Sequence, residues 1–582
     1  MHKATMRTKI RTNTPRTIPP PVINLAARPF QGIMRRIPDG KPGVRTRYRL
    51  AYEKSVIRVR VEAEDPCMLD LIATVSDPGT DHVLYEEDCI QLALCTGASA
   101  QPEGMLLLNA RGSRTGSGSG MQWACRASSS AHGWTLEVDI PLSASTGCLG
   151  LSLHRFFRGV KGEIQGIGSN LPHPQIASRF PCLVLKTGRR ARQSADAWRK
   201  AVTAHEQATE NAIVESVSAR LKKADQPGVP DNFTTLSRTL AERRFAREIN
   251  PNESFLCWNE AHFQHAVINL WDITGDRSWL ELLIPRIQAV WTLTGEARGA
   301  KDAMWGKPTP TWYNDTETGA ACTLVSGAIH WPITRWMRTV LEIPALSDLA
   351  PTARKWIEPA CRVLDFHDPE WIDLPDGSGM HLEPYNKGPQ RVYPRGGSRI
   401  NPLNREFFLT LPMIHMAALT GNAEYRRKVT ANARYFVSTS DISSRRFEWE
   451  YLVGACPADG EDLSHGACQV AFAEQCRMDG IVLTTTHLKK MANSLAELVF
   501  RHGDVPAETV RGYYPGLRVA VGAWSRLARF RPEVLPKVRR ILKTALVEQD
   551  KLFDGSEGWG IRLLTDTVRA EQYLQGKTPC TA

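Results

Sequence analysis

The spacing at which hydrophobic residues recur along this 582-residue chain changes once, near Phe233. Before that point apolar residues alternate with polar ones, as in 56–61, and after it they recur at helical spacing over long segments. Because side chains repeat every two residues in a strand and every 3.6 in a helix, the chain is predicted to be β-rich first and all-α afterwards. Single cores stop growing near roughly 250–300 residues, so at least two domains are expected.

The helical part repeats one hairpin. Two apolar helices are each followed by a short turn, Thr274-Gly275-Asp276 or Thr420-Gly421-Asn422, and then by a second helix. In each turn the glycine can take the left-handed conformation that ends a helix, and the Asp or Asn can cap the next one. The predicted hairpins are 262–273 with 279–291, 325–341 with 352–364, 415–419 with 425–436 and 469–478 with 488–501.

The connections 292–319 and 368–404 are too long and too rich in aromatic and Asn residues for a plain α-solenoid. Helical hairpins joined in this way resemble the α/α-toroid of carbohydrate-active enzymes, which include polysaccharide lyases, inverting hydrolases and uronyl epimerases. The resemblance implies an all-α (α/α) toroid catalytic domain over 231–552, with 553–582 as a tail. Toroid lyases commonly carry a β-sandwich after the helices, whereas here the β-rich part comes first.

Three phrases mark the β-rich part: an acidic pair at Glu87-Asp88 opening a strand, a Gly-Trp strand over 133–141 ending in Ile-Pro, and a strand over 150–155 ending in Arg. In this order they resemble family 9 carbohydrate-binding modules. The resemblance implies an antiparallel, jelly-roll-like β-sandwich over 40–185 that binds sugar by aromatic stacking. Trp123 is the candidate stacking residue, and Trp134 is expected in the core.

Residues 1–38 carry eight basic and no acidic side chains, so they are predicted to be a disordered basic leader. They lack the apolar segment of a secretory signal, which favours the cytoplasm, although a basic, acid-poor leader can also be an export or organelle address. Residues 186–230 are predicted to be a helical linker, since no Gly or Pro lies between Gly188 and Pro227.

The charge balance of +12 favours anionic partners without choosing among them. Nucleic-acid binding is disfavoured, because the one basic cluster near Arg190 is small and has Trp198 as its only aromatic neighbour. A membrane partner is not expected, since no run approaches the roughly 20 apolar residues that cross a bilayer. Metal-binding spacings and phosphate-binding Gly loops are missing from the sequence, so no metal and no cofactor are predicted.

The candidate site combines three connections of the toroid. Glu461-Asp462 and His465 stand at the start of a helix, where positions three apart share a face, so Asp462 can orient the imidazole of His465. Asp462 or Ser464 can also simply cap the helix. The predicted catalytic residues are His465, Asp462, Glu461, Tyr385 and Tyr451. The predicted substrate-binding residues are Trp312, Tyr313, Asp315, Glu317, His330, Asn386, Arg391, Arg395, Asn404, Arg405 and, in the β-rich part, Trp123.

The reaction is inferred from the kinds of side chain present. β-Elimination at a uronate needs a base, donors that neutralise the sugar carboxylate and an acid, which Tyr, Arg, Asn and His supply. The sequence therefore predicts β-elimination on an acidic, uronate-containing polysaccharide or oligosaccharide. Inverting hydrolysis needs two carboxyls about 6.5–9.5 Å apart, which Asp315 or Glu317 with Glu461 or Asp462 could provide. A C5 epimerase and a noncatalytic glycan-binding protein are further alternatives.

Overall fold

A computed structural model describes two parts of the chain. Between positions 22 and 184 it describes the strands named below and residue 142, and beyond them it describes 189–225, 231–252, 255–302, 305–313, 321–384, 398–451, 460–548 and 557–577. The chain divides into two compact units, Met1–Phe157 with Glu163–Glu206 and Arg158–Gly162 with Gln207–Ala582.

One sheet of the N-terminal unit shows the predicted alternation. Ile57, Val59 and Val61 are buried, whereas Arg58 and Arg60 between them are exposed. Alternate residues of a strand point to opposite faces, so one face of this sheet is covered and the other carries charge. Its antiparallel order is β2 (Phe30–Ile33), β4 (Thr46–Glu53), β5 (Val56–Glu64), β10 (Gly133–Pro141) and β9 (Ala124–Ser130).

The second sheet is antiparallel except for its pair β1–β13, which is parallel. Its order is β1 (Val22–Asn24), β13 (Cys182–Val184), β11 (Cys148–Phe157), β6 (Cys89–Cys95), β7 (Gly104–Asn109) and β8 (Arg114–Ser117), with β12 (Glu163–Gly166) joining β11 to β3 (Arg35–Ile37). Trp134 is buried, as expected, and Trp123 lies outside the described residues. That the two sheets form a jelly-roll-like sandwich stays a prediction.

Strands β1, β2 and β3 fall inside the predicted leader over 1–38 and pair with β13, β4 and β12. Each has only three or four residues, too few for periodicity to mark it against the basic background. The predicted linker is helical, with α2 over Arg189–Leu221 and the 3-10 helix η3 over Lys222–Asp225.

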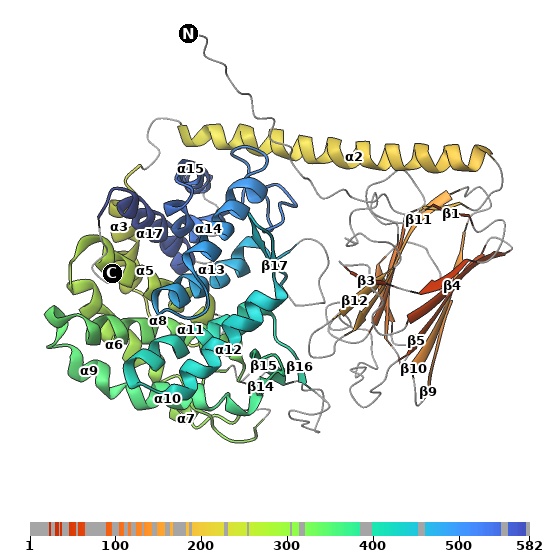
Figure 1. The fold of residues 1–582 in the computed structure, drawn as a ribbon. Helices are drawn as coiled ribbons and strands as arrows, with labels where there is room; N and C mark the ends of the chain where they lie inside the picture. The colour runs from red at the N-terminus through yellow and green to blue at the C-terminus, as the bar shows by residue number, and fades with distance from the viewer. Residues whose placement is uncertain are drawn as a thin grey trace, which may run out of the picture. The chain divides into compact units, whose positions relative to one another are not determined.

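Within its described residues, the helical unit is built on a closed ring of six helices. Most of them are labelled in Figure 1. Each packs against the next, and the last packs against the first. Most residues of these helices are buried on every side, which distinguishes them from helices with one solvent face. In ring order they are α5 (Ala261–Thr274), α8 (Thr323–Glu342), α11 (Leu403–Thr420), α13 (Leu463–Met478), the 3-10 helix η8 (Val519–Arg529) and α17 (Glu557–Leu574).

Each inner helix has an outer partner. The partners, in the same order, are α6 (Ser278–Trp291), α9 (Ala350–Lys355) with α10 (Ile357–Asp365), α12 (Ala423–Thr439), α14 (Thr485–Ser494), α15 (Val534–Val547) and α3 (Phe233–Phe245). The predicted toroid is thereby confirmed, and an open solenoid is excluded because the ring closes. The predicted turns are confirmed as well: Gly275 and Gly421 have φ of 68° and 69°, and Asn422 caps α12.

The connections alternate strictly in length. Those that follow an inner helix are short turns, such as 421–422, whereas those that lead into one are long, such as 292–322 and 440–462. All inner helices therefore run in the same direction. The end of the ring where they begin is called here the N-terminal mouth, and the end where they finish is the C-terminal mouth.

Residues 557–574, predicted to belong to a tail, form the inner helix α17. Its apolar residues Ile561, Leu564 and Val568 stand at helical spacing, but the buried polar residues Thr565, Asp566 and Thr567 lie among them and weaken the periodic signal. Two long connections also contain unexpected strands: β14 (Trp371–Asp373), β15 (Gly379–Pro384) and β16 (Ser398–Ile400) in one, β17 (Asp441–Ile442) and β18 (Phe447–Glu448) in the other. Among the described helices, none is both long and apolar enough to cross a bilayer.

Candidate functional site

The N-terminal mouth collects the three predicted site connections, because they lead into α8, α11 and α13. Two of them are in direct contact. The backbone N–H of Leu403, the first residue of α11, donates to the carbonyl of Tyr451 over 3.0 Å. The Tyr451 ring lies 5.1 Å, centroid to centroid, from the imidazole of His465 on α13. Tyr451 therefore joins the start of α11 to the Asp462–His465 segment.

The backbone around Glu461 is fixed on both sides. Its N–H donates to the carbonyl of Trp449 over 2.9 Å, and its carbonyl accepts from the N–H of Val510 at 2.9 Å. Gly460 before it has φ of +74°, and a Cβ there would lie 2.7 Å from the Val510 side chain. Glycine is required by both the conformation and the close approach. The two carboxyls that follow are thus held in place by neighbouring connections.

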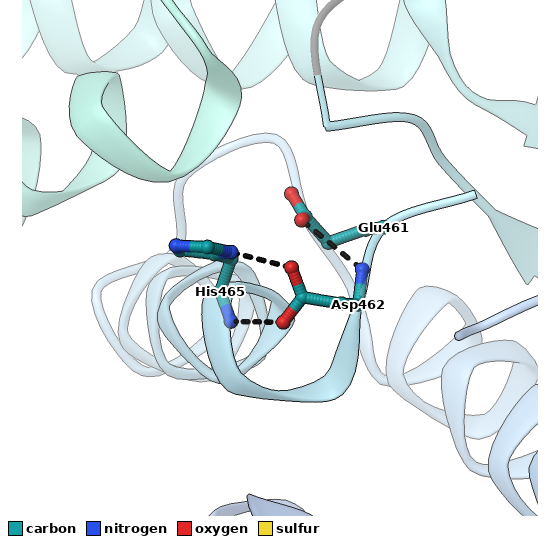
Figure 2. Close-up of side chains that lie close together, drawn as sticks. All are labelled: Glu461, Asp462 and His465. Carbon is teal, nitrogen blue, oxygen red and sulfur yellow. Dashed lines mark hydrogen bonds and ion pairs between the residues drawn. The ribbon is translucent and has the colours of Figure 1, made fainter. Parts of the chain in front are cut away.

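Asp462 caps α13 and orients His465 at the same time (Figure 2). Its Oδ1 accepts from the backbone N–H groups of Ser464 and His465 at 2.9 and 3.0 Å, and its Oδ2 is bonded to Nδ1 of the imidazole. The two interpretations left open by the sequence, cap and carboxylate-oriented imidazole, therefore both hold. With Nδ1 as the donor, Nε2 of His465 is left as an acceptor.

The two adjacent carboxyls ionise in opposite senses. Burial raises the pKa of Glu461 well above its ordinary value, and the neighbouring charge of Asp462 adds to this. Burial also opposes ionisation of Asp462, but its hydrogen bond to His465 and the charge of that imidazole outweigh burial and lower its pKa to about 2. Burial thus favours the protonated form of one carboxyl beside another that is held ionised, a divergence typical of the acid and base groups of active sites.

Glu461 accepts two hydrogen bonds, which favour its ionised form and partly offset the effect of burial. Nε2 of Gln469 donates to Oε2 of Glu461 over 2.7 Å, and the backbone N–H of Asp462 donates to Oε1 at 3.2 Å. Glu461 itself is fully buried, whereas the side chains of Asp462 and His465 are 30% and 37% exposed. Only the latter two can touch a substrate in this state.

These three side chains could also hold a metal ion. Each offers one ligand atom, and the three atoms lie within 4.8 Å of one another. A cation would have to displace the Nδ1 bond of His465 and ionise Glu461, since metal ligands bind in their deprotonated forms. The arrangement as it stands serves proton transfer better than metal binding.

A second acidic group borders the Glu461–His465 cluster. Its residues were not among the predicted site residues. Glu448 and Glu450 both face Arg511, at 3.8 and 3.7 Å. Burial raises the pKa of Glu448 although Arg446 and Arg511 oppose the shift. Arg511 lies in the connection 500–518, where no local motif marks it. Its spatial role follows from the pairing of Val510 with Glu461, which sequence spacing does not reveal.

Aromatic side chains complete the described part of the mouth. Trp258, which is 37% exposed, stacks on His262 with ring centroids 6.2 Å apart. The ring of Trp559, in the first turn of α17, lies 4.5 Å, centroid to centroid, from the same imidazole and is tilted against it. Nη1 of Arg562 donates to Nδ1 of His262 over 2.7 Å. Together with Arg562, burial holds the pKa of His262 well below its usual range, so the ring is neutral.

Three predicted substrate-binding residues are covered instead of exposed at the mouth. Trp312 is 1% exposed and its Nε1 donates to the carbonyl of Val290 over 2.9 Å. The Tyr313 hydroxyl donates to the carbonyl of Ala300 at 2.5 Å. His330 is fully buried beside Trp312, and burial lowers its pKa to about 3. This connection folds back onto α6, and Trp312 and Tyr313 are buried there. Their role in substrate binding stays a prediction.

The remaining predicted residues divide into two groups. Asn404 is buried and Arg405 partly buried in the first turn of α11, next to the Leu403–Tyr451 contact. The others lie outside the described residues: Tyr385, Asn386, Arg391, Arg395, Asp315, Glu317 and Trp123. Those that belong to the helical unit lie in connections that lead into inner helices and so end at the N-terminal mouth.

Fold and site together define an α/α toroid with an acidic and imidazole cluster at the N-terminal mouth. No protein-family model matches the chain, and no curated protein does. Three solved structures show a weak likeness. Two are inactive variants of an α-1,6-mannanase of Salegentibacter sp. HEL1_6, in complex with α-1,6-mannotriose and α-1,6-mannotetrose. The third is a family 76 glycoside hydrolase from a bovine Bacteroides thetaiotaomicron strain.

Sequence identity and TM-score are both low. The two mannanase structures are each 11% identical, cover 58% of this chain and 100% and 99% of their own, and have TM-scores of 0.36 and 0.35. The third is 9% identical, covers 89% of this chain and 96% of its own, and has a TM-score of 0.33. At such TM-scores these structures say nothing of the reaction or the substrate of this chain.

Proposed function

We propose that the helical unit is a carbohydrate-active enzyme that hydrolyses glycosidic bonds at its N-terminal mouth. The observation that carries the proposal is the ionised carboxylate of Asp462 bonded to the exposed imidazole of His465, next to the buried carboxyl of Glu461. Glycoside hydrolysis needs one group that gives a proton to the leaving oxygen and one that activates water. A carboxylate-oriented imidazole can serve as the second of these groups.

The exposed members of the cluster would meet the substrate. Asp462 holds the imidazole of His465 in one orientation, and Nε2 of His465 takes the proton of the attacking water. Glu461 acts as a positioning residue, because it is covered and its Oε1 accepts from the backbone N–H of Asp462 at 3.2 Å. Asp315 or Glu317, on the connection into α8, would supply the acid across the mouth.

Aromatic faces at the same mouth support a sugar ligand. Trp258 presents a partly exposed indole, and Trp258 and Trp559 both contact the His262 ring. Ligand sites combine apolar aromatic surface with a few fixed polar groups, which suits a pyranose with its apolar face and hydroxyl rim. The substrate is therefore proposed to be an oligosaccharide or polysaccharide.

The test is a product screen on neutral and uronate-containing glycans, with two readouts for every substrate. Hydrolysis releases new reducing ends without ultraviolet absorbance, whereas elimination releases them together with an absorbing unsaturated uronate. The proposal expects reducing ends alone, and their loss in His465→Ala. Products that absorb in proportion to the new reducing ends would replace hydrolysis by elimination.

Elimination is the second candidate, favoured by the contact between Tyr451 and His465. An imidazole base and a phenol acid next to each other can remove the C5 proton and protonate the leaving oxygen. This reaction requires an acidic substrate, and Arg391 and Arg395 are proposed to neutralise its carboxylate. A C5 epimerase would exchange that proton with solvent without cleavage, and a noncatalytic protein would bind glycans without any product.

For the N-terminal unit we propose a jelly-roll-like sandwich that resembles a carbohydrate-binding module and binds sugar through Trp123. The covered face of the first sheet, with Val59, Trp134 and Val138 buried, supports a packed two-layer structure. Affinity electrophoresis on immobilised glycans is the test. Retardation that Trp123→Ala abolishes supports the proposal, and equal mobility of both proteins on every glycan contradicts it.

A further inference from the structure

The C-terminal mouth, opposite the Asp462–His465 cluster, holds a cavity of about 540 Å³. It is lined mainly by the second halves of inner helices, such as Arg335 on α8 and Arg569 on α17, and reaches inward to His265 and Arg562. The volume lies within the roughly 300–1,000 Å³ of small-molecule sites. None of its lining residues belongs to the Glu461–His465 cluster or to the long connections, although Arg562 also bonds His262 at the N-terminal mouth.

Positive charge dominates the wall of this cavity. Seven arginines line it against three acidic residues, Glu342, Glu474 and Asp566. These carboxylates are already shared: Arg526 contacts both Glu474 and Asp566, at 2.9 and 3.3 Å. Asp272, which lies just beyond the wall, is likewise shared by Arg335 and Arg569 at 2.9 and 3.0 Å. The carboxylates of the protein are therefore too few to neutralise all the arginines of the wall.

Several donors of the wall have no hydrogen-bond partner among the described residues. Nη1 of Arg529 contacts Glu474 at 3.1 Å, but its buried Nε and Nη2 are unpartnered. The same holds for Nε of Arg477 and for the one N–H of the neutral His265 ring, whose two nitrogens are both unpartnered and which is 1% exposed. Buried donors are normally satisfied, so this set indicates a missing acceptor.

The arginines also oppose one another. Burial lowers the pKa of Arg335 to about 10, and the neighbouring charge of Arg569 acts in the same direction. Burial lowers the pKa of Arg562 to about 10 as well, with Arg526 contributing. Like charges in a partly desolvated wall destabilise each other, and an anion between them would relieve the repulsion.

We propose that the cavity binds a small, multiply charged oxyanion that carries phosphate or carboxylate groups. Guanidinium groups match the planar geometry of these anions and bind them through paired, charge-assisted hydrogen bonds. Arg529 and Arg477 supply the free donors, and His265 lines the same cavity from α5. This proposed anion site is independent of the reaction at the N-terminal mouth.

The test measures binding of pyrophosphate and of citrate to the full chain by calorimetry, with a neutral monosaccharide as the blank. Arg529→Gln removes unpartnered donors of the wall, and Arg531→Gln is the matched control, since Arg531 is paired with Glu533 and Glu497 outside the cavity. Affinity for the preferred anion is expected to fall about tenfold in Arg529→Gln and to stay unchanged in Arg531→Gln and His465→Ala.

Preference for pyrophosphate identifies a phosphate ligand and preference for citrate a carboxylate ligand. Arg477→Gln, on a different helix, gives a second reading if Arg529→Gln does not fold. The inference is overturned if neither anion binds the wild-type chain, or if both cavity variants bind as tightly as Arg531→Gln. Loss of glycan cleavage in His465→Ala with intact anion binding would separate this site from the proposed active site.

Discussion

The carboxylate of Asp462 holds the imidazole of His465 through Oδ2 and the start of helix α13 through Oδ1. The side chain that orients the proposed base is therefore also a structural cap. Substitutions at this position change stability and chemistry together unless the two contributions are separated by design. The predictions below follow from this relationship and from the closed ring that carries it.

Replacing His465 by alanine is expected to lower glycan cleavage by about 100- to 10,000-fold, the usual contribution of a general base. The midpoint of thermal unfolding should change little, because the side chain is 37% exposed. Ser464→Ala is the control, since it removes a hydroxyl bonded to the same carboxylate and leaves the Asp462–His465 bond in place. Equal activity of the two variants would remove His465 from the mechanism.

Asp462→Asn and Asp462→Ala separate the two functions of this residue. Because Asn can still cap α13, the Asp462→Asn variant should be about as stable as the wild type. The Asp462→Ala variant should lose about 1 kcal/mol of unfolding free energy. Both variants lose the ionised carboxylate and should lose activity to a similar degree. Urea unfolding combined with initial rates checks this, and an active Asn variant would mean that the cap alone matters.

Glu461 should make the protein less stable as pH rises. Its pKa is raised in the folded state, so folding takes up a proton between the ordinary glutamate value, about 4.3, and the raised one. The stability linked to this group is present below that interval and is lost as pH increases through it. Thermal midpoints of Glu461→Gln and wild type should therefore coincide near pH 4 and diverge at higher pH, with the Gln variant more stable. A constant difference would contradict the shift.

Gly327 is expected to be indispensable for the ring. A Cβ there would lie 2.3 Å from the backbone N of Leu409, where α8 crosses α11, and backbone cannot move aside cheaply. Gly327→Ala should cost about 3 kcal/mol or more. Ala328→Gly on the same helix, which costs about 1 kcal/mol through helix propensity, is the control. Similar unfolding free energies for the two variants would show that the helices can separate.

Chelators should leave activity unchanged. The three possible ligands are engaged otherwise, because His465 Nδ1 is bonded to Asp462 and burial favours the protonated form of Glu461. Rates before and after treatment with EDTA, followed by readdition of zinc or calcium, measure this. A loss that one of these ions restores would place a metal at Glu461, Asp462 and His465.

Local signals predicted local structure well. The turns around Gly275 and Gly421 and the cap at Asn422 follow from short-range chemistry, and the structure confirms them. The pairing of Asp462 with His465 was predictable for the same reason, since helix geometry places residues three apart on one face.

Features set by distant contacts could not be predicted. The aromatic residues Trp312 and Tyr313 look like a sugar platform in the sequence, and their burial depends on how a long connection folds onto α6. Arg511 reaches the acidic group only through backbone pairing between separate connections. The arginines of the C-terminal mouth come from several helices, one or two from each, so no window of the sequence shows their accumulation.

The position of α17 between η8 and α5 has a consequence for biosynthesis. The first inner helix, α5, is synthesised some three hundred residues before the last one, α17. The buried polar groups of α5 therefore have no hydrogen-bond partners from α17 until translation is nearly complete. Asn269, for example, bonds Thr565 and Asp566. Nascent chains stalled before residue 557 should therefore remain protease-sensitive throughout the helical unit, and protection should arise in a single late step.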